Sequence, residues 1–391
     1  MDILFFSLLT NLLYYCCGKL FVEKNYSSSN NQFYIYFLGF VSISFIALLV
    51  NFVTKLSPSI NTTIYIVILV AFFGKFKLKF KKDDLTFLLL SSLITFSLVI
   101  YSNVNRPDAG LYHLPFISML NEHKLIIGIN NIHFRFGHTS ILQYISAINN
   151  NYIFKEQGIT LPLASIVSFF YVYFLNDVWR VIKKKDLPNI GNIFSLFILI
   201  YISYKITRYS SFGNDAVSHL TFFYLISYIL KNNFNNLDFN KTFLISVFIF
   251  INKPTLGLVF IIPGIIFLTK YNLISKKLLK LLYSYPLILL FLWLIKNLLI
   301  SGCFIFPAKI TCVESLPWTD NEMIIKAYKE SEAWSKGWPD RKNKKIKMSD
   351  FNKNFNWFDA WSSKHLKYIL KIIIPYIIVL MFITFLIRKY L

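Results

Sequence analysis

The chain has 391 residues, of which 55% are hydrophobic, 18% are aromatic and only 15% are charged. Soluble globular domains average about 25% charged residues, so this composition excludes an ordinary soluble domain. The net charge of +22 would suit a nucleic-acid partner, but the basic residues stand in short blocks between apolar runs. Basic loops beside apolar spans are typical of membrane proteins, so we expect no nucleic-acid partner.

Apolar runs between polar breaks predict an all-α polytopic bundle of about eleven transmembrane helices. The predicted spans lie near 3–22, 33–54, 58–74, 85–102, 158–176, 190–204, 217–230, 241–252, 254–270, 279–300 and 366–388. We group them as N-terminal helices 1–84, a core 85–300, an outer segment 301–365 and a C-terminal helix 366–391.

Basic blocks set the expected orientation of the bundle, because Lys and Arg favour the cytoplasmic side. Four such blocks fall on the same side of the predicted helices, at 75–84, 180–186, 276–280 and 388–389. The segments 103–157, 205–216 and 301–365 then lie on the outer face of the cytoplasmic membrane. The basic block 341–347 disagrees with this orientation, although long translocated loops follow the rule weakly.

The first outer segment is rich in groups that carry chemistry, since 103–150 holds four of the six His and two of the six Arg. Asp108 follows a predicted span directly, so a catalytic carboxylate at the membrane surface is one interpretation and a turn or cap residue is the other. An amphipathic interfacial helix is expected to open near Pro115 and end at Glu122, with a second over 138–150. The His spacing contains no HExxH pattern, which argues against a His metal site.

Four of the six Arg lie in predicted outer segments, where positive residues are not favoured: Arg106, Arg135, Arg208 and Arg341. A guanidinium group binds phosphate through two parallel hydrogen bonds, so phosphate recognition is one interpretation. Contact with lipid headgroups or pairing with nearby acids is the other. Lys253 precedes a proline at a break between two apolar runs, and is either a cavity-lining group or part of a short interfacial loop.

Three further positions keep two interpretations each. Asp215 precedes an apolar run and would cap the helix that follows, or would face the same outer site as Asp108. Segment 301–365 holds five of the seven Trp; for Trp334 and Trp338 the choice is between a membrane-interface belt and stacking on sugar rings.

Two cysteines flank a short loop in the last outer segment. Cys303 and Cys312 would pair if this loop faces an oxidising compartment, and would otherwise remain free thiols. The sequence leaves both alternatives open.

Several motifs carry a resemblance to a known family. D-x-G-L-Y-H-L-P (Asp108–Pro115) and G-I-N-N-I-H-F-R-F-G (Gly128–Gly137) resemble bacterial polytopic membrane proteins of the "LIC_10190" type. S-G-C-F-I-F-P (Ser301–Pro307) and E-A-W-S-K-G-W-P (Glu332–Pro339) are also similar to that family. These proteins in turn resemble GT-C glycosyltransferases, multi-span enzymes that use lipid-phosphate sugars.

The resemblance implies a GT-C-like bundle that transfers a sugar from a polyprenyl-phosphate donor to an envelope glycan, lipid or protein. Because GT-C enzymes carry an acid in the first outer loop after a span, Asp108 would be the general base or, alternatively, a ligand of Mg or Mn. Three spans precede the one leading to Asp108, and there is no Asp-x-Asp pair, so the chain departs from the simple pattern.

The expected site follows from these interpretations. The residues assigned to the donor phosphate are Arg106, Arg135, Arg208 and Lys253; those assigned to acceptor positioning are His113, Glu122, His133, Asp215, Trp334 and Trp338. The alternatives are a glycan polymerase or ligase, which would depend more on the outer Arg residues, and a transporter or flippase of envelope precursors, suggested by Lys253 at a helix break.

Overall fold

A computed structural model shows the fold. It describes residues 2–22, 32–76, 81–101, 108–184, 189–209, 212–232, 236–269, 284–339, 346–371, 373–375, 377–378 and 381. These residues form helices and their connections and contain no β-strand, so the all-α prediction is confirmed for them. The chain divides into two compact units, 1–300 and 301–391. The division falls where the outer segment was expected to begin.

The first unit consists of helices joined by short 3₁₀ and π-helical turns. Its α-helices are α1 (Asp2–Phe21), α2 (Gln32–Val53), α3 (Pro58–Lys75), α4 (Lys82–Ile100), α5 (Leu114–Glu122), α6 (Ile141–Ile148), α7 (Leu161–Lys184), α8 (Ile190–Tyr204), α9 (Ile206–Tyr209), α10 (Asp215–Lys231), α11 (Phe239–Asn252), α12 (Ile261–Thr269) and α15 (Tyr285–Ser301). The connecting turns are η1 (Ala109–His113), η2 (Ile129–Asn131), η3 (Phe134–Gly137), η4 (Lys155–Thr160) and η6 (Pro254–Phe260).

Among the residues that the structure describes, five helical stretches are long and apolar enough to cross a membrane. They are α1, α2, α3, α4 and the continuous stretch 155–183, which contains most of α7. Four further apolar stretches are shorter, namely α8, α11, 254–269 and α15. Helices thus occupy the positions of the apolar runs that predicted them, because such runs have no other way to satisfy their backbone groups away from water.

α1 and α2 pack with their backbones in close approach. A Cβ atom at Gly39 would lie 1.8 Å from the carbonyl oxygen of Tyr14, and one at Gly18 would lie 1.9 Å from that of Ile35. Small residues permit this approach, which is a common way for apolar helices to pack without a hydrophobic driving force. The pair therefore depends on having no side chain at either glycine.

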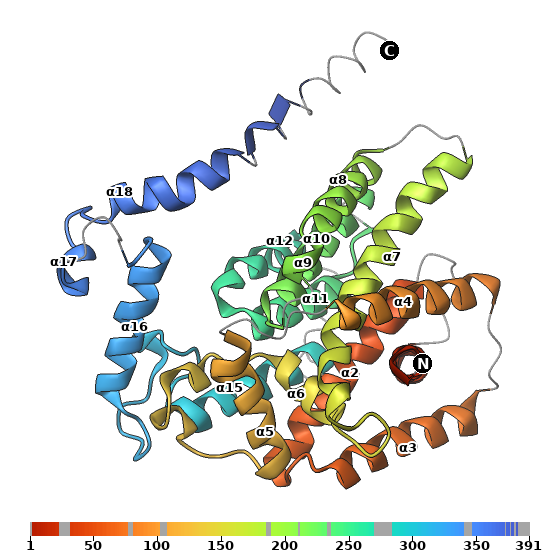
Figure 1. The fold of residues 1–391 in the computed structure, drawn as a ribbon, viewed down its shortest axis with the longest axis horizontal. Coiled ribbons are helices and arrows are strands. Elements are labelled where there is room, and N and C mark those ends of the chain that lie inside the picture. The colour runs from red at the N-terminus through yellow and green to blue at the C-terminus, as the bar shows by residue number, and fades with distance from the viewer. Residues whose placement is uncertain are drawn as a thin grey trace. The chain divides into compact units, whose positions relative to one another are not determined.

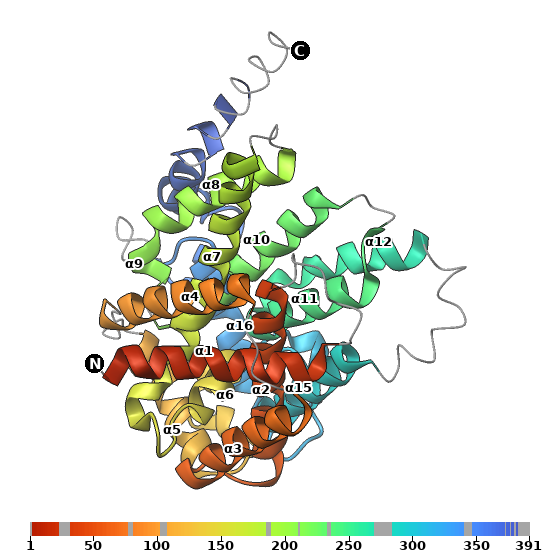
Figure 2. The same ribbon diagram turned by 90° about the vertical axis from the view of Figure 1, so that its right-hand side faces the viewer.

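α7, α8 and α10 lie side by side, and α11 packs against α10 (Figures 1 and 2). Near the end of α7, the carboxylate of Asp177 accepts hydrogen bonds from Lys231, the last residue of α10, and from Ser195 near the start of α8. α7 and α10 therefore run in one direction and α8 in the other. α10 has 17 residues, so its two ends are about 25 Å apart.

The structure corrects the expected second interfacial helix over 138–150. α6 covers only Ile141–Ile148, and all eight of its residues are buried. It packs against α2, α5 and α7 inside the first unit. A capping box between Ser140 and Gln143 satisfies its first backbone groups, which allows a helix this short to be buried.

The second unit begins with a loop closed by a disulfide between Cys303 and Cys312, so the structure shows the paired alternative. Its helices are α16 (Asn321–Ser335), α17 (Met348–Phe351) and α18 (Phe358–Trp361), followed by the π-helical turn η9 (Ser362–Leu366). A small core holds them, with Ala333, Phe351 and Ala360 buried and Trp338, Ile346, Met348 and Trp357 packed against them.

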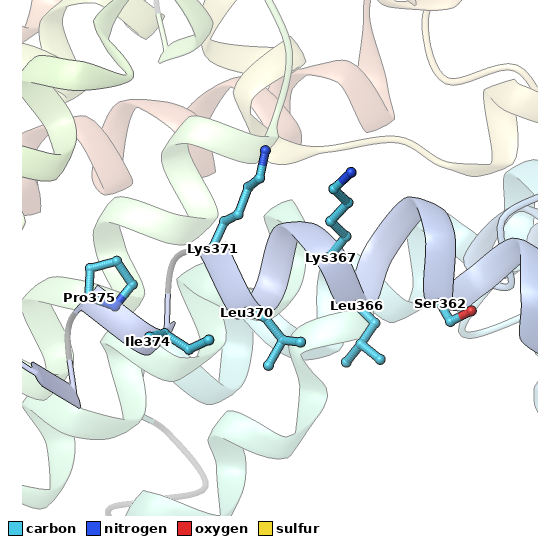
Figure 3. A pocket seen from close by; sticks show the side chains of 7 residues that line it. All are labelled: Ser362, Leu366, Lys367, Leu370, Lys371, Ile374 and Pro375. Atoms are coloured by element: carbon cyan, nitrogen blue, oxygen red, sulfur yellow. The ribbon is translucent and has the colours of Figure 1, made fainter.

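The helical segment that continues from α18 to residue 371 has two different sides. Lys367 and Lys371 point to one side, and Leu366 and Leu370 point to the other (Figure 3). Leu370, Ile373 and Ile374 are 43%, 45% and 49% exposed, as expected for the start of the predicted C-terminal span. The remainder of that span, from 382 onward, lies outside the described residues.

Candidate functional site

Asp108 lies directly before η1 and forms an ion pair with Arg135. Its side chain is 63% exposed, and its Oδ1 lies 3.8 Å from Nη1 of Arg135. The Arg135 guanidinium also lies over the rings of Tyr112 and Phe134, 5.4 Å from each ring centroid. Two aromatic faces and one carboxylate hold the guanidinium, so Arg135 is preorganised beside an accessible acid.

Two other predicted site residues lie near this pair in the sequence but have different contacts. His133 caps the turn that carries Arg135, because its Nδ1 accepts the backbone N–H of Arg135 at 3.3 Å. Glu122, at the end of α5, accepts a hydrogen bond from Ser118 at 2.9 Å. The structure therefore gives His133 a local supporting role and shows Glu122 with no described contact to Asp108.

Asp215 is bound by two cations. Lys253 donates to its Oδ1 at 2.5 Å, and Nη2 of Arg208 lies 3.6 Å from its Oδ2. The N-cap position of α10 is Asn214, and no side chain caps the helix there. Of the two interpretations of Asp215, the structure does not show the helix cap: its carboxylate instead pairs with Lys253, which follows the end of α11.

A buried hydrogen-bond network connects the segments that carry these two ion-pair groups. Gln143 bonds to Nδ1 of His113 at 3.1 Å and accepts the backbone N–H of Ser140 at 2.8 Å. The Ser140 hydroxyl donates to Oδ1 of Asn252 at 2.7 Å, and the Asn214 amide donates to the Asn252 carbonyl at 2.9 Å. The network thus joins η1, α6, α10 and α11 into one polar site.

Both carboxylates influence the same two side chains. Burial lowers the pKa of His113 to about 4, against a smaller opposite effect of Asp108 and Asp215. Burial also raises the pKa of Tyr112 to about 12, and both carboxylates add to this while Arg135 opposes it. At neutral pH the site therefore contains a neutral imidazole and a neutral phenol between two acids and their cations.

The arrangement does not fit a divalent metal ion. Asp108 faces Arg135, and Asp215 faces Arg208 and Lys253, so each carboxylate already has a cationic partner. Among the described residues, no group of three His, Cys, Asp or Glu side chains is placed to hold a metal. We therefore derive no step through Mg or Mn.

The profile of one family, described as a domain of unknown function (DUF8201), matches residues 1–390. The chain belongs to the DUF8201 family. It matches no curated protein and no solved structure.

In this DUF8201 chain, the structure brings six of the predicted residues into one site: Asp108, His113, Arg135, Arg208, Asp215 and Lys253. Arg106 and Arg341 lie outside the described residues. Trp334 and Trp338 belong to the second unit, where Trp334 is 53% exposed and Trp338 packs edge-on against Phe351 with ring centroids 5.1 Å apart.

The sequence did not predict the residues that hydrogen-bond to the site residues and hold them in place. Gln143 and Ser140 form an S-x-x-Q capping box, a signal that can be recognised in the sequence. Lys296 of α15 gave no such signal; it is fully buried, bonds to Thr139 and lies 3.2 Å from the Trp293 ring centroid. Lys296 therefore anchors the residue next to Ser140 to the core of the DUF8201 bundle.

Proposed function

We propose that this DUF8201 chain is an integral-membrane, GT-C-like glycosyltransferase of the outer face of the cytoplasmic membrane. It transfers a sugar from a polyprenyl-phosphate donor to an envelope glycan, lipid or protein. The observation that carries the proposal is that two carboxylates and three cations from distant segments meet in one site at the ends of apolar helices.

The disulfide supports the outer orientation of the second unit. Disulfides persist in oxidising compartments and are rare in the cytosol. The Cys303–Cys312 pair lies just after α15, whose apolar run is expected to cross from the cytoplasmic to the outer side. By the same alternation of spans, the segment that contains Asp108 lies on the outer side as well.

Asp108 is the group best placed to act as general base. Its exposed carboxylate takes the proton of an acceptor hydroxyl while that oxygen forms a bond to the anomeric carbon of the donor sugar. The bond between the anomeric carbon and the phosphate oxygen breaks, and the polyprenyl phosphate leaves with the electron pair.

The cations of the site stabilise the departing phosphate. Two aromatic rings hold Arg135 in place. The carboxylate of Asp215 keeps Lys253 and Arg208 in the site when no substrate is bound. Groups fixed in advance stabilise developing charge without reorganising at the moment of reaction. The acid–base pairs thus keep the cations in position until a phosphate binds.

The test is Asp108→Asn, which keeps the size of the side chain and removes the base. Cells that lack the protein are complemented with each variant, and their lipid-linked sugars and envelope glycans are compared. We expect a loss of transfer of about 100-fold or more, with the variant still inserted at normal levels. Glu156→Gln, at an exposed acid of η4, is the matched control and should transfer normally. Full activity of Asp108→Asn would exclude the assignment.

Arg135→Ala separates the glycosyltransferase from a polymerase or ligase. A polymerase or ligase that depends on outer arginines would lose its product in Arg135→Ala and keep it in Asp108→Asn. The proposed transferase needs both groups, so both variants should accumulate lipid-linked sugar and lack the same glycan.

A further inference from the structure

Two hydrogen bonds determine which ring nitrogen of His113 carries the proton. Gln143 lies between the backbone N–H of Ser140, at 2.8 Å, and Nδ1 of His113, at 3.1 Å. An N–H can only be met by the amide oxygen, so Oε1 of Gln143 faces Ser140. The other end of the amide is then the NH₂ group, which donates to Nδ1 of His113.

A nitrogen that accepts a hydrogen bond carries no proton, so the neutral imidazole has its proton on Nε2. The opposite amide orientation would place two donors against each other at Ser140. The hydrogen-bonded side chains are buried, with Gln143 1% and His113 3% exposed. Water therefore does not compensate for a hydrogen bond lost from this network.

The Nε2–H of His113 lies on the side of Gly213, which has no side chain to cover it. A Cβ atom built on Gly213 would lie 3.8 Å from it, and it has no hydrogen-bond partner within the part of the chain that the structure describes. The rings of Tyr112 and Phe212 flank the imidazole, with centroids 4.2 and 6.1 Å away. The Nε2–H group is therefore a donor that a ligand can use.

The surroundings define the group that this donor meets. Asp108 and Asp215 both act on His113 electrostatically, so the site offers carboxylate oxygens to a group that binds at Nε2. A hydroxyl oxygen accepts from Nε2–H and donates its own proton to a carboxylate, which satisfies both sides.

We propose that Gln143 locks His113 as the Nε2–H tautomer, and that this N–H binds a hydroxyl group of the sugar substrate. Gln143 is a positioning residue and His113 determines specificity. The substrate class rests on the proposed function, whereas the tautomer does not.

The tautomer is measured by ¹⁵N nuclear magnetic resonance of the histidine-labelled full chain in lipid nanodiscs at pH 7, with the His113 signals assigned by their loss in His113→Gln. We expect a protonated Nε2 and an unprotonated Nδ1. In Gln143→Glu, the carboxylate attracts a proton to Nδ1, so the Nδ1 signal should change to that of a protonated nitrogen. Gln157→Glu, at an exposed residue of η4, should leave it unchanged. A protonated Nδ1 in the wild type, or no change in Gln143→Glu, overturns the lock.

The ligand class is measured on the same sample with free glucose, mannose, galactose, arabinose and inorganic phosphate as probes. A sugar that shifts the Nε2 signal supports the proposal; a shift with phosphate alone, or with none of the probes, refutes it.

In complemented cells, His113→Gln keeps a donor near the Nε2 position and should retain most transfer, whereas His113→Asn should lose about tenfold. Equal transfer by the two variants contradicts the role of Nε2. Unchanged glycans in cells that lack the protein would reject the proposed function. The ¹⁵N nuclear magnetic resonance spectra would still decide the tautomer of His113 and whether a sugar shifts the Nε2 signal.

Discussion

Gly39→Ala tests the close approach of α1 and α2. The added Cβ would lie 1.8 Å from the carbonyl oxygen of Tyr14 and 2.8 Å from the backbone nitrogen of Gly18, whereas ordinary contacts begin at 3.4 Å. The helices would have to separate by about 1.6 Å, and overpacking of this kind usually costs about 1–3 kcal/mol. Because both obstacles are backbone atoms that cannot rotate away, we expect about 3 kcal/mol of lost unfolding free energy.

The measurement is an unfolding titration with SDS in mixed micelles, followed by tryptophan fluorescence. Gly74→Ala is the matched control, since nothing lies within 4 Å of a Cβ at that position in α3. Alanine favours helix more than glycine does, so this variant should be unchanged or slightly more stable. If Gly39→Ala unfolds at the same SDS concentration as Gly74→Ala, the inferred helix contact is incorrect.

Two further predictions concern the other end of the bundle and the second unit. Lys231→Met should destabilise by about 3–5 kcal/mol in the same titration, because it leaves the mostly buried carboxylate of Asp177 without its cation. Adding Asp177→Asn should recover much of this loss, and a double variant as unstable as the single one would argue against the pair. Trp338→Ala should make the second unit sensitive to protease through loss of its small core, whereas Trp334→Ala, at an exposed side chain, should leave protease resistance unchanged. Equal protease sensitivity of the two variants would show that Trp338 is not a core residue.

Helix positions could be predicted from the sequence because apolar length is a local property. The burial of α6 could not, since it depends on what packs around the helix. Its residues suggested an interfacial helix, but the Ser140–Gln143 box satisfies the helix start internally and α2, α5 and α7 cover the rest.

The sequence indicated which charged residues could form a site, but it did not show which side chains form ion pairs with one another. Asp108 and Arg135 are close in sequence, so their association was a reasonable expectation. Asp215 kept two interpretations because an acid before an apolar run usually caps it, and its partner Lys253 comes from another helix. Only the tertiary structure shows that Asp215 and Asp108 act on the same imidazole.

The hydrogen bonds through Asn252 have a consequence for biogenesis. The acid of the first outer segment lies before α7, whereas Asp215, Arg208 and Lys253 come after α8. If the chain is divided between α7 and α8, the first part contains Asp108 and the second part contains Asp215. During synthesis the site is absent until α11 has been made and Asn252 bonds to Ser140 and Asn214. A partly made chain therefore carries Asp108 and Arg135 without Asp215, Arg208 and Lys253, and the complete set of charged groups is present only after α11.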